Sequence, residues 1–119
     1  MKRILWISRH VMTKEQLEGL ARLYGEFEVE IYAGTVESMG QLKEQVENCD
    51  VVAAVLPALM LSELVKMADG RPVLQAVSGR VRTGRKIQVR DGVFEEEYEF
   101  RHLYWQEIKK MEMEVVNYE

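Results

Sequence analysis

The chain contains two uninterrupted apolar runs, residues 4–7 and 51–56, and each leads into a segment whose apolar residues have helical spacing. Apolar runs of this length are typical of strands covered on both faces, as in the parallel sheets of α/β proteins. Strands that alternate with helices are joined as parallel strands through right-handed crossovers. This feature restricts the chain to a small α/β fold before any other property is considered.

Local signals predict the helices and strands between these runs. Thr13 and Gln16 form a capping box, which predicts a helix that ends near Gly25. Its apolar stripe consists of Leu17, Leu20, Ala21 and Tyr24. Glutamate and apolar side chains alternate over residues 26–31, which predicts a strand at 27–34 near a sheet edge with one solvated face. A second capping box, Ser38 to Gln41, predicts a further helix with a thinner apolar stripe.

A third helix is expected between Pro57 and Asp69, with a fourth strand at residues 72–77. Strand and helix then alternate three times before that last strand. The predicted fold class is therefore α/β, with a small Rossmann-like parallel sheet and flanking helices.

The last third of the chain has a different pattern. Asp91-Gly92 separates two alternating runs, and this dipeptide is the strongest local signal for a β-hairpin. For residues 103–116 the pattern leaves two interpretations open, a continued strand–turn–strand or a helix. We expect one domain over residues 1–119, with a core at 1–80 and a C-terminal antiparallel hairpin extension at 81–119.

Charge and composition argue against several functional classes. The 20 acidic and 16 basic residues give a net charge of −4, which disfavours general binding to duplex nucleic acid or to a membrane surface. No segment approaches the roughly 20 apolar residues of a membrane span, and the N-terminus lacks a signal-peptide pattern, so a cytoplasmic location is expected. The single cysteine, Cys49, precludes an internal disulfide and is expected to be a buried thiol.

Common cofactor and metal motifs are missing from the sequence. It contains no GxGxxG after the first strand, no GxxxxGK[ST] and no HExxH, so neither a cofactor nor a metal is expected. The acidic residues 95–97 and Glu99 fall in an alternating strand, where they are expected to form a solvated edge. His102 lies in the same strand and is expected to be a core or interface histidine with satisfied hydrogen bonds.

The carboxyl ends of the four predicted strands carry the candidate site residues. In open parallel sheets, ligands bind past these ends, where helix N-termini converge. The residues are Ser8, Arg9 and His10 after the first strand, Gly34 and Thr35 after the second, Leu56 and Pro57 after the third, and Ser78, Gly79 and Arg80 after the fourth. We expect them to line one rim. His10 is interpreted either as a general acid or base beside Arg9, or as a loop histidine that only bonds a carbonyl.

Residues 80–90 concentrate basic side chains and include none of the acidic ones. The cations are Arg80, Arg82, Arg85, Lys86 and Arg90. Beside a strand end they predict an anion pocket, because arginine and helix N-terminal N–H groups suit phosphate oxygens. The alternative is that they are solvated hairpin residues whose charges protect a sheet edge.

The tip Ser8-Arg9-His10 and the stretch DVVAAVLPALMLSEL at residues 50–64 resemble small accessory proteins of type III CRISPR systems. Those proteins begin with a short strand, an Arg-His tip and a helix, and later show an apolar strand that ends in Leu-Pro. The matching residues are Ser8, Arg9, His10, Asp50, Leu56 and Pro57, and the similarity covers residues 3–80. Where the family has Pro-Gly after the histidine, this chain has Val11-Met12.

The resemblance implies a CARF-like Rossmann fold that forms a homodimer and binds a cyclic oligoadenylate across the two-fold axis. It also implies a ring nuclease, in which the ribose 2′-hydroxyl attacks the adjacent phosphorus without a metal ion. The resemblance implies that Arg9, with Arg80 or Arg82, binds phosphate. It implies that His10 is the general acid or base and that the hydroxyls of Ser8 and Ser78 orient the ligand.

Two other functions stay open. The first is a sensor or sink that binds the same nucleotide without cutting it. The second is a dimeric adaptor without a small ligand, whose contact surface is formed by Tyr98, Tyr104 and Trp105. An apolar surplus near the C-terminus is compatible with a homodimer in either case.

Overall fold

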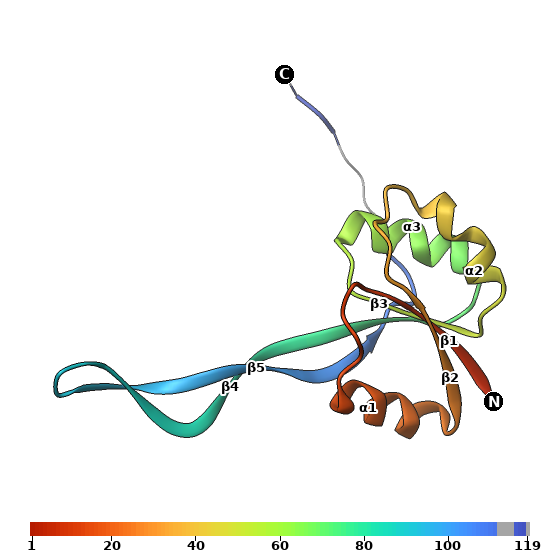
Figure 1. Cartoon of the computed structure of the whole chain (residues 1–119). Helices are drawn as coiled ribbons and strands as arrows, with labels where there is room; N and C mark the ends of the chain where they lie inside the picture. The colour runs from red at the N-terminus through yellow and green to blue at the C-terminus, as the bar shows by residue number, and fades with distance from the viewer. Residues whose placement is uncertain (112–115, 119) are drawn as a thin grey trace.

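The chain folds into an α/β structure built on one mixed sheet, seen here in a computed structural model that describes residues 1–111 and 116–118 (Figure 1). The elements are β1 (Lys2–Ile7), α1 (Lys14–Tyr24), β2 (Phe27–Tyr32), the 3-10 turn η1 (Met39–Leu42), α2 (Lys43–Glu47), β3 (Val51–Ala54), α3 (Ala58–Ala68), β4 (Val73–Arg90) and β5 (Val93–Glu107). The strand order is β2-β1-β3-β4-β5, with four parallel strands and β5 antiparallel to β4. The predicted fold class is confirmed. No helix in the described ranges combines the length and hydropathy that a membrane crossing requires.

The two apolar runs form the centre of the sheet, as their pattern predicts. Strands β1 and β3 are adjacent, and their residues 4–7 and 51–54 are at most 2% exposed. Side chains alternate between two apolar layers, so that Leu5 packs on the side of α3 and Trp6 on the side of α1. Each fully buried side chain of this size contributes about 1.5–3 kcal/mol through its removal from water. Strand β2 lies at one edge of the sheet, and its glutamates are exposed as predicted.

The capping boxes form at the predicted positions. The Gln16 N–H donates to Thr13 Oγ1 at 3.2 Å, and the Thr13 N–H donates to Gln16 Oε1 at 2.9 Å, which fixes the start of α1. At the second box, the Ser38 N–H donates to Gln41 Oε1 at 3.4 Å. There the chain forms the short turn η1 before the five residues of α2, so the second helix is shorter than its pattern suggests.

Strand β4 is longer than the sequence predicts. A strand end at Ser78 to Arg80 is expected from the sequence, but β4 continues without a break to Arg90. Gly79 lies inside the strand, and a Cβ at this position would meet Leu103 Cδ1 at 2.7 Å. The glycine therefore leaves space for a neighbouring side chain rather than ending the strand. The expected boundary between core and extension at residues 80 and 81 thus falls inside β4 and is not marked by a break in the strand.

Past the point where β3 ends, β4 and β5 pair only with each other and project from the sheet as a two-stranded ribbon (Figure 1). We call residues 78–102 the arm. Its turn at Asp91-Gly92 confirms the predicted hairpin, and Gly92 has a φ of 71°, which glycine adopts without strain. Of the segment left open, residues 103–107 continue β5 without the expected turn and without a helix, whereas residues 108–111 are neither strand nor helix. Residues 112–115 of the predicted last strand lie outside the described part of the chain.

Candidate functional site

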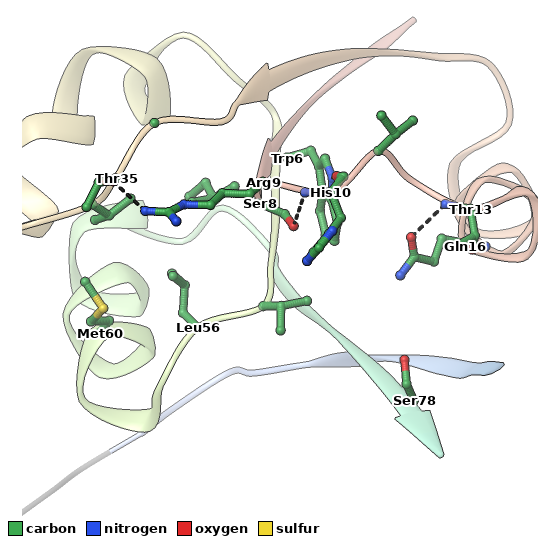
Figure 2. A pocket seen from close by; sticks show the side chains of 15 residues that line it. Trp6, Ser8, Arg9, His10, Thr13, Gln16, Thr35, Leu56, Met60 and Ser78 are labelled. Carbon is green, nitrogen blue, oxygen red and sulfur yellow. Dashed lines mark hydrogen bonds between the residues drawn. The ribbon is translucent and has the colours of Figure 1, made fainter. Parts of the chain in front are cut away.

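A pocket of about 560 Å³ lies at the carboxyl ends of the parallel strands (Figure 2). Its walls are formed by the segments that follow β1, β2 and β3, together with part of β4 and the start of α1. The predicted residues that line it are Ser8, Arg9, His10, Gly34, Thr35, Leu56 and Ser78. The prediction that these strand ends share one rim holds for this group.

The remaining candidates do not line the pocket: Pro57, Gly79, Arg80, Arg82 and Arg85. Pro57 is the N-cap residue of α3, and the other four lie along the arm. Arg80 stacks over the ring of Tyr98, with 4.5 Å between the guanidinium carbon and the ring centre. Arg85 forms an ion pair with Glu97 at 3.0 Å. The expectation of an arginine cluster at the rim is therefore wrong, because the continuing strand places these cations on the hairpin.

The loop that carries Ser8, Arg9 and His10 is held by hydrogen bonds to its own backbone. The buried indole of Trp6 donates from Nε1 to the His10 carbonyl at 2.8 Å. The His10 N–H donates to Ser8 Oγ at 3.1 Å, and the Ser8 N–H donates to the Tyr32 carbonyl at 3.2 Å. A buried indole N–H needs an acceptor, so Trp6 ties the core of the sheet to this loop.

Arg9 extends along the pocket toward the loop after β2 (Figure 2). Its Nη2 donates to Thr35 Oγ1 at 2.5 Å, and the Thr35 carbonyl accepts from Gln41 Nε2 at 2.9 Å. In the described ranges, no carboxylate forms an ion pair with Arg9, and no other lysine or arginine lines the pocket. Among the residues that the structure describes, the pocket thus contains one positive charge without a carboxylate partner.

The remaining wall of the pocket is mainly apolar. Trp6, Ile7, Val36, Leu56 and Met60 all contribute to it. Helix α3 begins at the same edge, and its first N–H groups receive no side-chain cap from the N-cap proline. These groups add partial positive charge near the pocket. The arrangement suits a ligand with a flat apolar part and an anionic part.

Eight lining residues were not among the candidates from the sequence: Trp6, Ile7, Val11, Thr13, Gln16, Val36, Val55 and Met60. Trp6 interrupts an aliphatic strand two residues before Ser8, and the need of its buried N–H for an acceptor was a usable signal. Gln16 is the third residue of α1 and belongs to the predicted capping box. Met60 gives no comparable signal, because its apolar position in α3 is typical of core packing.

The other titratable candidates lie away from this pocket. Cys49 is buried as predicted, and burial raises the pKa of its thiol. His102 lies beside Trp105, with 5.3 Å between ring centres, and its Nδ1 is buried without a hydrogen-bond partner in the described part of the chain. The expectation of a satisfied histidine is therefore wrong. Burial lowers the pKa of the His102 imidazole.

Within the described ranges, no group of three or more histidine, cysteine, aspartate or glutamate side chains is arranged to hold a metal ion. In the acidic run of β5, Glu97 accepts a hydrogen bond from Thr83 Oγ1 at 2.8 Å besides its ion pair with Arg85.

Comparison with protein families, with curated proteins and with solved structures gives no match to this chain.

Proposed function

We propose that the pocket binds a cyclic oligoadenylate and that the protein cleaves it as a metal-independent ring nuclease. The observation that carries this proposal is that one apolar-walled pocket contains both an imidazole, His10, and a guanidinium, Arg9, that has no carboxylate partner in the described part of the chain. The resemblance of the loop to type III CRISPR accessory proteins supports the choice of nucleotide.

The pocket has a surface for each part of such a ligand. Adenine is flat and largely apolar, which suits the wall formed by Trp6, Leu56 and Met60. A phosphate group suits Arg9, because a guanidinium donates paired hydrogen bonds to its oxygens. A ring with few phosphates needs only a compact positive site, so the net charge of −4 does not oppose binding.

Cleavage requires two proton transfers and charge stabilisation at phosphorus. The 2′-oxygen forms a bond to phosphorus, the bond to the 5′-oxygen breaks, and the products are a 2′,3′-cyclic phosphate and a 5′-hydroxyl. His10 serves one transfer, either taking the 2′-hydroxyl proton or protonating the leaving 5′-oxygen, and water serves the other. Arg9 stabilises the charge that develops on the phosphoryl oxygens.

A homodimer in the cytoplasm is part of this proposal. Because Arg80 and Arg82 do not line the pocket, one chain offers a single arginine to the ligand. A two-fold symmetric ring would meet Arg9 from two copies and so two positive charges. The adaptor alternative loses one of its three contact residues, because Trp105 packs against Trp6 within the chain.

The test combines binding and cleavage of cyclic tetra-adenylate and cyclic hexa-adenylate. Arg9→Gln should weaken binding about 10- to 150-fold, the range for a lost hydrogen bond to a charged group. His10→Asn should retain binding and slow cleavage about 10²- to 10⁴-fold, the usual contribution of general acid–base catalysis. Arg22→Gln removes an exposed charge outside the pocket and is the matched control.

Thermal shift and chromatography of the products separate the outcomes. A melting temperature that rises with ring concentration shows binding, since a ligand of the native state stabilises it. Binding with the ring recovered intact would identify a sensor or sink. Absence of any shift, or wild-type behaviour of both pocket variants, would contradict a nucleotide site here.

A further inference from the structure

The two faces of the arm carry different side chains. Between residues 78 and 82 the pairing with β5 is regular, and Arg80 lies opposite Phe100 while Arg82 lies opposite Tyr98. Directly opposed residues of an antiparallel pair project to the same face, and alternate residues do so as well. We call the face formed by Arg80, Arg82, Tyr98 and Phe100 the aromatic face. Ser78, which lines the pocket, projects to this same face at the base of the arm.

The rings of the aromatic face are open to solvent. Phe100 is 77% exposed and Tyr98 is 41% exposed, although both lie in a regular strand. The guanidinium of Arg80 lies over one side of the Tyr98 ring. A two-stranded ribbon has no second layer to cover such rings, and alone it is only marginally stable in water. The exposed rings are therefore available to a flat partner.

The cations of the aromatic face have no carboxylate partners among the described residues. In the ranges that the structure describes, neither Arg80 nor Arg82 forms an ion pair. The ion pairs of the arm instead use Glu97 and Glu99, with Arg85 and Arg101 as their partners. Glu97 and Glu99 alternate with Tyr98 along β5, so they project to the opposite face. Positive charge and exposed rings are thus gathered on one side of the arm.

We propose that the aromatic face is a binding surface for single-stranded RNA or DNA, separate from the pocket. Proteins that bind single strands combine arginines for the phosphates with aromatic rings on which bases stack. The surface offers both groups within two adjacent cross-strand pairs. A duplex is a poorer partner, because its bases are already stacked on each other and cannot cover Tyr98 or Phe100. An acidic peptide would pair with the arginines but has no flat groups for the rings.

The test is a fluorescence-anisotropy titration of the full chain with a labelled oligouridine of about 12 nucleotides. Phe100→Ala should weaken binding between about 5- and 150-fold, the range for loss of one base-stacking ring. Phe100→Leu keeps an apolar side chain without the ring and should weaken binding similarly, which separates stacking from general apolar contact.

A matched pair of charge variants tests which face binds. Arg82→Gln removes a cation from the aromatic face, and Arg101→Gln removes one from the opposite face. Arg82→Gln should weaken binding and lower the slope of log K against log salt by about 1, whereas Arg101→Gln should leave both within about twofold. Arg9→Gln, which lies in the pocket, should also leave oligouridine binding unchanged.

Four results would overturn the proposal. The first is an absence of saturable binding by the wild-type chain, and the second is equal weakening by Arg82→Gln and Arg101→Gln. The third is binding of a duplex of equal length as tightly as the single strand. The fourth is sedimentation showing that Phe100→Ala dissociates a wild-type dimer, since the face would then be an interface between copies. None of these depends on whether the pocket binds or cleaves a cyclic nucleotide.

Discussion

Replacement of Gly19 by alanine should affect stability in opposite directions, depending on the residue at position 105. Gly19 lies in α1, where a Cβ would be 2.9 Å from Trp105 Cδ1 and 3.2 Å from Trp105 Nε1. The indole cannot easily move away, because its Nε1 donates to the Gln16 carbonyl at 2.9 Å. Its ring also makes an edge contact with Trp6, with 5.8 Å between centres.

Two opposing effects of Gly19→Ala decide whether the substitution raises or lowers the free energy of unfolding. Alanine in place of glycine inside a helix gains about 1 kcal/mol through its higher helix propensity. Overpacking against a fixed ring costs about 1–3 kcal/mol. In the native chain Gly19→Ala should therefore lower the free energy of unfolding by about 0–2 kcal/mol. In a Trp105→Ala background the ring is gone, and the same substitution should raise the free energy of unfolding by about 1 kcal/mol.

The assay is urea unfolding, followed by far-ultraviolet circular dichroism, of the wild type, both single variants and the double variant. The coupling energy of this double-mutant cycle should be about 1–3 kcal/mol. If Gly19→Ala stabilises the chain equally with and without Trp105, then the indole does not lie on α1 and the packing of β5 against α1 described above is wrong.

Three further predictions concern other contacts. Trp6→Phe removes the donor to the His10 carbonyl and part of a buried ring, so the free energy of unfolding should fall by about 1–3 kcal/mol. Urea titration measures this change, and an unchanged midpoint would contradict the hydrogen bond between Trp6 and His10. Burial lowers the pKa of His102 in the fold, so as the pH falls the unfolded chain takes up this proton before the folded chain does. The free energy of unfolding should therefore be unaffected above the ordinary pKa of about 6.5 and decline as the pH falls below it. His102→Gln should reduce this decline, and a variant with the same pH profile as the wild type would refute the prediction. Arg71 donates to three backbone carbonyls, so Arg71→Lys should lower the melting temperature by several degrees, whereas equal melting would show that lysine replaces the whole network.

Features that depend on local chemistry were predictable from the sequence. The apolar runs of β1 and β3 identify buried parallel strands because only strands covered on both faces lack polar alternation. The Thr13 and Gln16 pair identifies the start of α1 because its bonds are formed within one turn. The Ser8-Arg9-His10 tip follows from the same logic, since the end of a buried strand in a parallel sheet faces the ligand edge.

Features that depend on distant contacts were not predictable. Gly79 resembles a turn residue in sequence, and only its contact with Leu103 in the next strand explains its place inside β4. That one misassignment also misplaced the arginines. A strand advances roughly 3.3 Å per residue, so Arg85 lies roughly 20 Å further along the chain than Ser78. Proximity in sequence to a presumed strand end therefore carried no information about proximity to the pocket.

The contact between Trp6 and Trp105 contains both of the chain's tryptophans. All indole emission therefore originates from one seam, where the end of β5 meets α1 and β1. The arm contains phenylalanine and tyrosine but no tryptophan. Its unfolding should therefore change tyrosine absorbance and leave tryptophan emission unchanged. The two optical signals can thus be recorded in one cuvette to ask whether the ribbon loosens before the sheet that supports it.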